Sequence, residues 1–221
     1  MVDSGEAIGT GPDSAGVDFG LIDSRLPPAG FIRRDHYDAY YPYYASPLDY
    51  FTADVRAQLE SRTGHVFGTR PRTAKPIGGT YMQDVAGTAQ GNWFFPGAYY
   101  SNTTDLSPSL GLASDYVDPS QPVMAIGTTV AGVSMGLYSF GVQSQGLVNR
   151  AFRDVRPDGN TYCYENFLSG QTTGGLPLSR PSGVLLMAML NDVSLRVERS
   201  PAASCAAAGT SMTANATAFE R

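Results

Sequence analysis

The stretch Asp35–Asp38 holds the pair of side chains best suited to bind a metal ion. Zinc prefers three or four nitrogen, sulfur or oxygen ligands in a tetrahedral shell, and two of them commonly stand close together in the sequence. His36 and Asp38 have this spacing, and Asp49 and His65 are the further ligands considered. Because the chain has only 2 histidines, little is left to complete such a site. A solvated turn is the alternative interpretation.

Other catalytic chemistries find weaker support. Gly132–Gly136 spells G-x-S-x-G, but no helix-forming stretch follows the serine, as a nucleophile elbow requires. Glycoside hydrolysis needs two carboxylates that face each other across a cleft, and Asp84, Glu165 and Glu198 lie in or beside expected strands. Surface salt bridges are the alternative use of these acids. The sequence contains no phosphate-binding or dinucleotide-binding loop, so we expect no cofactor.

Aromatic side chains offer the better-supported binding chemistry. Tyrosines crowd the segment 37–50, where Pro42 and Pro47 prevent a continuous helix or a central strand. Sugar rings stack on exposed aromatic faces while polar groups bond their hydroxyls. The predicted ligand-binding residues are Tyr40, Tyr41, Tyr43, Tyr44, Trp93, Tyr99 and Tyr100. A tyrosine packing belt, or a contact with another chain, is the alternative for the tyrosines, and a buried indole in a core hairpin is the alternative for Trp93.

Composition limits the classes of partner. The formal net charge is −5 and the pI is near 4.9, and Lys75 is the only lysine, so we expect no nucleic-acid partner. No apolar run approaches the roughly 20 residues that a membrane-spanning helix needs. A charged-then-apolar leader is also absent, so we expect any export signal to have been removed or left out of this sequence.

The two cysteines, Cys163 and Cys205, predict a single disulfide. The bridge would close a loop of about 40 residues, which the loop-entropy model values at roughly 3–4 kcal/mol. Two unrelated buried thiols are the alternative. A disulfide indicates an oxidising compartment, so the expected location is secreted, periplasmic or cell-surface.

Glycine (25 residues) and proline (15 residues) are abundant, which favours short strands joined by turns over long helices. The sequence predicts a mainly β fold, a barrel or sandwich of about ten short strands with one short helix. That helix is expected over 53–62, with Thr52 as its N-cap. The expected strands are 81–85, 92–95, 110–113, 122–129, 136–142, 161–167, 184–190 and 194–199.

Four regions are expected along the chain. They are a β-hairpin segment (1–26), a tyrosine-rich strap with the short helix (27–65), the main β domain (66–200) and a loosely ordered C-terminal tail (201–221). The tail is Ala/Ser/Thr-rich and has few large apolar side chains, which is why we expect it to be loosely held.

The first region resembles a known family. The run 7–9 (AIG), then Gly16, then 18–23 (DFGLID), is similar to the last hairpin of lysostaphin-type peptidase domains. That family's ending carries two histidines for zinc binding and catalysis, and the matching positions here are Gly16 and Asp18. The resemblance therefore implies a degenerate, zinc-free, peptidase-like segment.

Three later runs resemble uncharacterised secreted bacterial proteins in which such a segment precedes a second β domain. They are 47–51 (PLDYF), 83–96 (QDVAGTAQGNWFFP) and 159–164 (GNTYCY). That group has no activity to transfer. We therefore expect a non-catalytic secreted or cell-surface protein with a structural, assembly or ligand-binding role, with carbohydrate as a candidate ligand and a homo-oligomer or partner chain as a candidate assembly. The alternative is a hydrolase that acts on a polysaccharide or peptidoglycan-like substrate.

Overall fold

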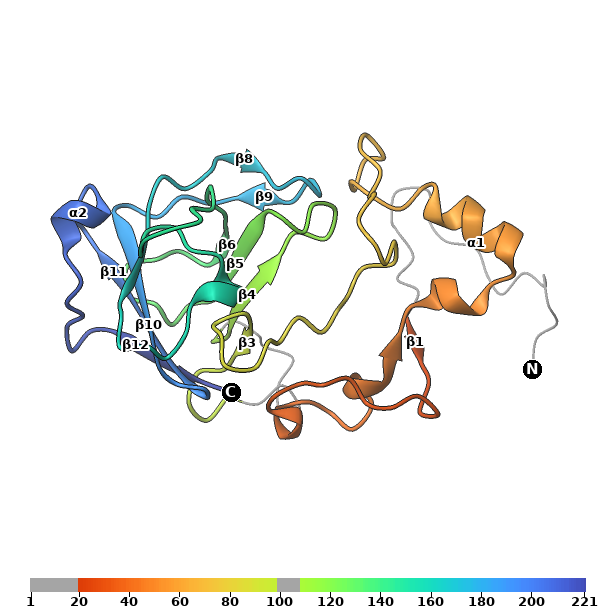
Figure 1. The fold of residues 1–221 in the computed structure, drawn as a ribbon, viewed down its shortest axis with the longest axis horizontal. Coiled ribbons are helices and arrows are strands. Elements are labelled where there is room, and N and C mark those ends of the chain that lie inside the picture. The colour runs from red at the N-terminus through yellow and green to blue at the C-terminus, as the bar shows by residue number, and fades with distance from the viewer. Residues whose placement is uncertain (1–19, 99–107) are drawn as a thin grey trace.

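The computed structural model describes residues 20–98 and 108–221, which form two four-stranded antiparallel sheets beside a smaller N-terminal part (Figure 1). The first sheet has the order β3-β4-β5-β6, with β3 (Gly91–Trp93), β4 (Leu110–Ser114), β5 (Pro122–Ile126) and β6 (Gly136–Tyr138). The second has the order β12-β11-β10-β7, with β7 (Tyr162–Tyr164), β10 (Val184–Asn191), β11 (Ser194–Ser200) and β12 (Thr217–Glu220).

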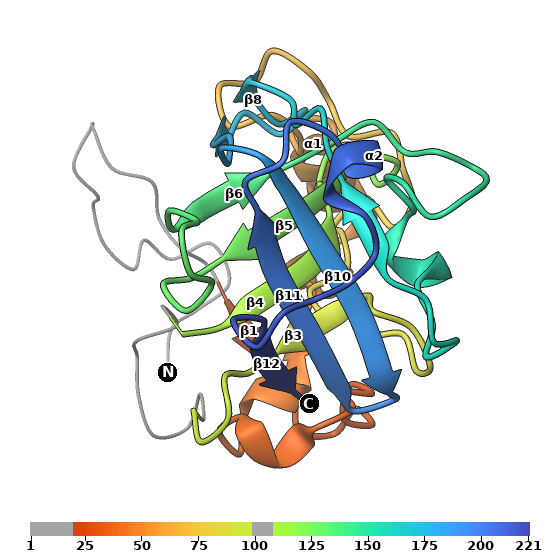
Figure 2. The ribbon, with the colours of Figure 1, turned by 90° about the vertical axis from the view of Figure 1, so that its left-hand side faces the viewer.

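The fold is mainly β, as predicted, and it is a sandwich. Figure 2 shows strands of the second sheet crossing those of the first, and neither sheet in the described part of the chain closes on itself. Two small antiparallel ladders complete the twelve described strands: β1 (Leu21–Ile22) with β2 (Tyr44–Ala45), and β8 (Gly170–Gln171) with β9 (Pro177–Leu178).

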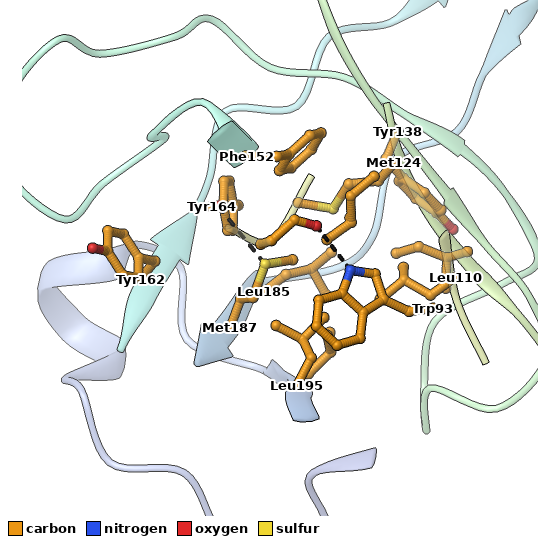
Figure 3. Close-up of a cluster of buried hydrophobic side chains, with 14 of the residues drawn as sticks. Trp93, Leu110, Met124, Tyr138, Phe152, Tyr162, Tyr164, Leu185, Met187 and Leu195 are labelled. Carbon is orange, nitrogen blue, oxygen red and sulfur yellow. Dashed lines mark hydrogen bonds between the residues drawn. The ribbon is translucent and has the colours of Figure 1, made fainter. Parts of the chain in front are cut away.

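Inward-facing side chains that alternate along the strands fill the space between the two sheets (Figure 3). They include Leu110, Leu112, Met124, Ile126, Leu185, Met187, Leu195 and Val197. Trp93 lies among them, fully buried, and its indole N–H donates to the main-chain carbonyl of Ala89 at 2.8 Å. The core therefore uses the indole as a satisfied packing group.

The apolar run on β10 is buried on both faces over its first half, as its continuous hydrophobicity predicts. Leu185 and Met187 face the other sheet, whereas Val184 and Leu186 pack with Cys163 and Cys205 on the outer side. β11 pairs with β10 from Ser200 to Ser194, which confirms the predicted hairpin.

The predicted disulfide is present. Cys163 on β7 is bonded to Cys205, with a Cα–Cα distance of 5.7 Å and a sequence separation of 42. Cys205 begins the short helix α2 (Cys205–Ala208), whose N-cap Ser204 accepts a hydrogen bond from the Ala207 amide. The bridge therefore holds the chain beyond β11 against the outer face of the second sheet.

The C-terminal region differs from the loose tail that its composition predicted. β12 pairs with β11 over Val197↔Thr217 to Ser194↔Glu220, and Phe219 is buried in the core. A single Phe in an Ala/Ser/Thr-rich stretch does not create the alternating apolar pattern that predicts a strand. Strand pairing and the burial of this one ring nonetheless order the segment.

The expected strand 81–85 is also not a strand. This stretch is irregular, and its organising group is the carboxylate of Asp84, which accepts hydrogen bonds from the amides of Ile32 (3.1 Å) and Asn92 (2.9 Å). A Cβ at Gly91 would lie 2.4 Å from Asp84 Oδ1, so glycine is required there. A side chain thus takes the place of the expected hairpin ladder.

The N-terminal part, residues 20–65, lies beside the sandwich, with α1 (Ala53–Glu60) and β1 at the opposite end of the long axis from β10 and β11 (Figure 1). Residue 52 precedes α1 as predicted, although the Thr52 hydroxyl bonds Asp54 (2.6 Å) and makes no capping bond to the helix backbone. The tyrosine-rich segment is a series of 3-10 turns, at Arg34–His36, Tyr41–Tyr43 and Pro47–Tyr50. Residues 1–19, which carry most of the peptidase-like run, lie outside the described residues.

Candidate ligand-binding site

An aromatic cluster joins the N-terminal part to the first sheet. Its members are Phe31, Tyr37, Tyr41, Tyr44, Tyr81 and Phe94. The rings of Tyr37 and Tyr41 are stacked, with centroids 5.0 Å apart. Phe94, one residue beyond β3, meets Tyr37 edge-on at 5.5 Å. Such contacts add about 0.5–1.5 kcal/mol per pair beyond area burial, so the cluster fixes the position of the tyrosine-rich segment.

Three members of the cluster form what we call the tyrosine wall: Tyr41, Tyr44 and Tyr81. Their ring centroids lie 5.3–6.3 Å apart, and each ring meets the next close to edge-on. The Tyr81 hydroxyl donates to the main-chain carbonyl of Pro42 at 3.2 Å. β2 places Tyr44 through its pairing with β1. Segments about 40 residues apart in sequence thus meet at this wall.

The tyrosine wall borders a groove of about 380 Å³, which we call the tyrosine groove. Its other lining residues are Gly20, Leu21, Ala45, Ser46, Pro47, Gly78 and Gly79. A Cβ on Gly78 would lie 2.5 Å from the Ser46 hydroxyl oxygen, so the absence of a side chain there keeps this end of the groove open. The groove combines aromatic rings with hydroxyl groups and main-chain polar atoms.

A second hollow, of about 420 Å³, lies on the outer face of the first sheet and shares Tyr41 with the tyrosine groove. Asn92, Gly111, Ala125 and Leu137 face each other across its strands and form the floor. The hollow exists because Gly111 and Ala125 are small. Its lining is mainly apolar. One of its few polar groups is the side-chain amide of Asn92, which donates a hydrogen bond to the Tyr37 hydroxyl at 3.0 Å.

Of the predicted sugar-binding residues, the structure brings Tyr41 and Tyr44 together at the tyrosine groove. Tyr40 is 67% exposed but lines neither hollow. Tyr43 also lines neither hollow, and its hydroxyl accepts a hydrogen bond from Arg34 at 2.9 Å. Tyr99 and Tyr100 lie outside the described residues.

The prediction was wrong for Trp93 as a binding surface. Its side chain is fully buried between the sheets, so the core interpretation of this residue holds and the ligand-platform interpretation does not. Sequence reasoning also missed Tyr81. It stands alone in an irregular stretch, and only folding places its ring beside Tyr41 and Tyr44.

The structure does not assemble the predicted metal site. His36 is fully buried with its ring 4.6 Å from that of Phe94, whereas Asp38 is exposed and accepts hydrogen bonds from the amides of Tyr40 and Tyr41. Asp49 pairs with Arg56 at 3.0 Å. Among the residues that the structure describes, no three His, Cys, Asp or Glu side chains gather as metal ligands would.

Burial of His36 has a consequence for stability. Burial, together with the charge of Arg33, lowers the pKa of the imidazole, while Asp35 and Glu220 act in the opposite direction. Below the unfolded pKa of about 6.5, the unfolded chain binds a proton at this site that the folded chain does not. The free energy of unfolding is therefore expected to fall between about pH 7 and about pH 5.

Urea denaturation over this pH range measures that loss, and His36→Gln is expected to reduce its slope. His65→Gln is the comparison variant, because it replaces the other histidine of the sequence at a half-buried position. An unchanged slope in His36→Gln would remove His36 as the cause.

The three acids considered for hydrolysis each hold a loop in place. Asp84 binds two main-chain amides, as described above. Glu165 accepts a hydrogen bond from the Cys205 amide at 2.5 Å, and Glu198 accepts one from the Thr213 amide at 2.6 Å. Glu165 and Glu198 therefore anchor the connection between β11 and β12, and neither lines one of the two hollows.

Comparisons with known proteins add no family to this picture. No protein-family model, no curated protein and no solved structure matches the chain. None of the helices in residues 20–98 and 108–221 has the length and apolar character needed to cross a membrane.

Proposed function

We propose that this protein is a non-catalytic glycan-binding protein of an extracytoplasmic compartment and that its ligand lies in the tyrosine groove. The observation that carries the proposal is the tyrosine wall, in which Tyr44 and Tyr81 remain 38% and 45% exposed beside a groove of about 380 Å³. Sugar rings bind to such accessible aromatic faces through their C–H surfaces, while hydroxyls and main-chain groups bond the sugar hydroxyls.

Geometry favours the tyrosine groove over the hollow on the sheet as the sugar site. The groove is bordered by three tyrosines together with Ser46, whereas the hollow on the sheet is lined mainly by apolar residues and has few hydrogen-bonding side chains. Sugars expose several hydroxyls per ring, and each loses a water partner on binding, so a mainly apolar site discriminates against them.

The disulfide supports the compartment. Cys163–Cys205 is a structural bridge between β7 and α2, and such bridges persist in oxidising compartments and are rare in the reducing cytosol. A secreted, periplasmic or cell-surface location provides both the oxidising conditions and access to polysaccharide.

Isothermal titration calorimetry with three hexasaccharides tests the proposal: cellohexaose, hexa-N-acetylchitohexaose and hexagalacturonate. We expect at least one to bind, and Tyr44→Ala and Tyr81→Ala each to weaken that binding by about tenfold, since loss of one stacking contact is worth about 1.4 kcal/mol. Tyr81→Phe keeps the ring and should retain most of the affinity.

Tyr40→Ala is the matched control for these variants. Its side chain is the more exposed, yet it lines neither hollow, so the affinity should not change. A loss of binding in Tyr40→Ala equal to that in Tyr44→Ala would move the site to the outer tyrosine surface. Absence of binding to all three hexasaccharides would overturn the proposal.

A further inference from the structure

A third hollow, of about 290 Å³, lies next to the tyrosine groove and collects positive charge. We call it the basic pocket, and its lining includes Arg72, Lys75 and Arg153. Gln83 and Ser114 add uncharged polar groups to the same lining. The lining also holds Asp84 and Asp115, so its three cations exceed its two carboxylates by one, in a chain whose net charge is −5.

Arg72 is the unusual member of the pocket because it is only 7% exposed. Its Nε donates to the carbonyl of Pro76 at 3.0 Å, and its Nη1 donates to the carbonyl of Tyr116. Buried arginines normally have a carboxylate partner. Among the ion pairs in residues 20–98 and 108–221, none involves Arg72, Lys75 or Arg153.

The acids near the pocket have other partners. Asp84 accepts main-chain amides at both oxygens. Asp115 accepts the amides of Val117, Asp118 and Gly174 at 2.8–3.0 Å. The hydrogen bond from Arg56 is the largest cause of the lowered pKa of Glu60, and the charge of Lys75 is the smallest of its causes. Main-chain N–H groups thus compensate the two carboxylates of the lining, and the three cations retain the capacity to bind an anion.

The chain segment 79–82 separates the basic pocket from the tyrosine groove. Gly79 lines both, Thr80 and Met82 line the basic pocket, and Tyr81 lines the tyrosine groove. An added Cβ at Gly79 would meet no atom within 4 Å, so the space beside this glycine is open. A chain-like ligand can cross from one hollow to the other over this glycine.

We propose that the glycan bound by this protein is acidic, with one sugar carboxylate in the basic pocket and a neighbouring ring against Tyr81 and Tyr44. This inference rests on the proposed glycan-binding function and names its substrate class. Lys75 and Arg153, both exposed, supply the charged contacts to the carboxylate, and Arg72 forms the buried wall behind them. Charge-assisted hydrogen bonds to such an anion are about twice as strong as neutral ones.

The test compares hexagalacturonate with its fully methyl-esterified form, in which the same sugar chain has lost its charges. Calorimetry is expected to show binding of the acid at least about tenfold tighter than of the ester. Lys75→Gln/Arg153→Gln should remove this preference and leave the ester affinity unchanged. Added salt should weaken binding of the acid alone.

Arg62→Gln/Arg180→Gln is the matched control, because it removes two exposed positive charges that line none of the three hollows. It should keep the preference for the acid. Equal, Tyr81-dependent binding of acid and ester would overturn this inference and leave the proposed function standing. Binding of neither form, together with no binding of neutral hexasaccharides, would overturn both.

Discussion

Replacing Arg221 by methionine is expected to lower the free energy of unfolding by about 3 kcal/mol. The side chain is fully buried, and its guanidinium lies 4.1 Å above the ring of Trp93. It donates to the main-chain carbonyls of Gln90 at 2.9 Å and Thr88 at 2.5 Å. Methionine fills a similar volume but leaves these buried acceptors without the guanidinium donors.

One effect opposes this loss. Burial lowers the pKa of Arg221, so the folded state bears a desolvation cost that methionine removes. The Thr88 carbonyl loses its donor, and the Gln90 carbonyl keeps only the Val85 amide. These losses and the lost cation–π contact outweigh this gain, because a buried acceptor left unpaired costs about 1–3 kcal/mol. Urea denaturation measures the difference. Arg180→Met, at an exposed position, is the control and should change stability by less than about 0.5 kcal/mol; a similarly small change for Arg221→Met would contradict the argument.

Removing the disulfide is the second change with a large expected effect. Cys163→Ala/Cys205→Ala should lower the free energy of unfolding by about 2–4 kcal/mol, because the bridge closes a loop with a sequence separation of 42 and restricts the unfolded chain. Both cysteines are also buried beside Val184 and Leu186, so the truncation adds a small packing loss to the same total.

Urea denaturation with and without dithiothreitol separates the two contributions. Reduction should destabilise the wild-type protein by most of the double variant's loss and should leave the double variant unchanged. A wild-type protein that is insensitive to complete reduction, verified by thiol titration, would show that the bridge adds nothing to stability.

The sequence predicted the structure best where the pattern of apolar residues matches the burial of the strand. The continuous apolar run 184–190, followed by the alternating run 194–199, predicted the β10–β11 hairpin, which is present with nearly the same bounds. Two cysteines left one pairing, and it is the observed disulfide. The prediction of a strand over 81–85 was wrong because the carboxylate of Asp84 accepts the main-chain hydrogen bonds that a partner strand would accept. Local strand propensity does not predict such side-chain bonds.

The candidate site was only partly predictable. Tyr41 and Tyr44 were identified from their crowded segment, but exposure and neighbourhood depend on tertiary contacts. Tyr81 joins them from some 40 residues away, and Trp93, an equally conspicuous aromatic residue in the sequence, faces the core. The basic pocket left little signal, since Arg153 joins Arg72 and Lys75 from a distant part of the sequence.

The pairing at the outer strands of the sandwich limits how copies of this protein can associate. Phe94, next to β3, exchanges main-chain hydrogen bonds with Glu220 of β12 at 2.7 and 2.8 Å, so these two outer strands satisfy each other. On the opposite side, Leu137 of β6 accepts the amide of Ser179, and Cys163 of β7 exchanges hydrogen bonds with Leu147 and Asn149.

Unpaired outer strands act as templates on which further chains add and aggregate. In the described part of the chain, β6, β7 and β12 each have a main-chain partner at the outer edge, and Phe94 beside β3 is paired with β12. Adding a strand at these paired positions would first require those main-chain bonds to break. Association through side-chain surfaces has no such cost, and the exposed tyrosines offer one such surface.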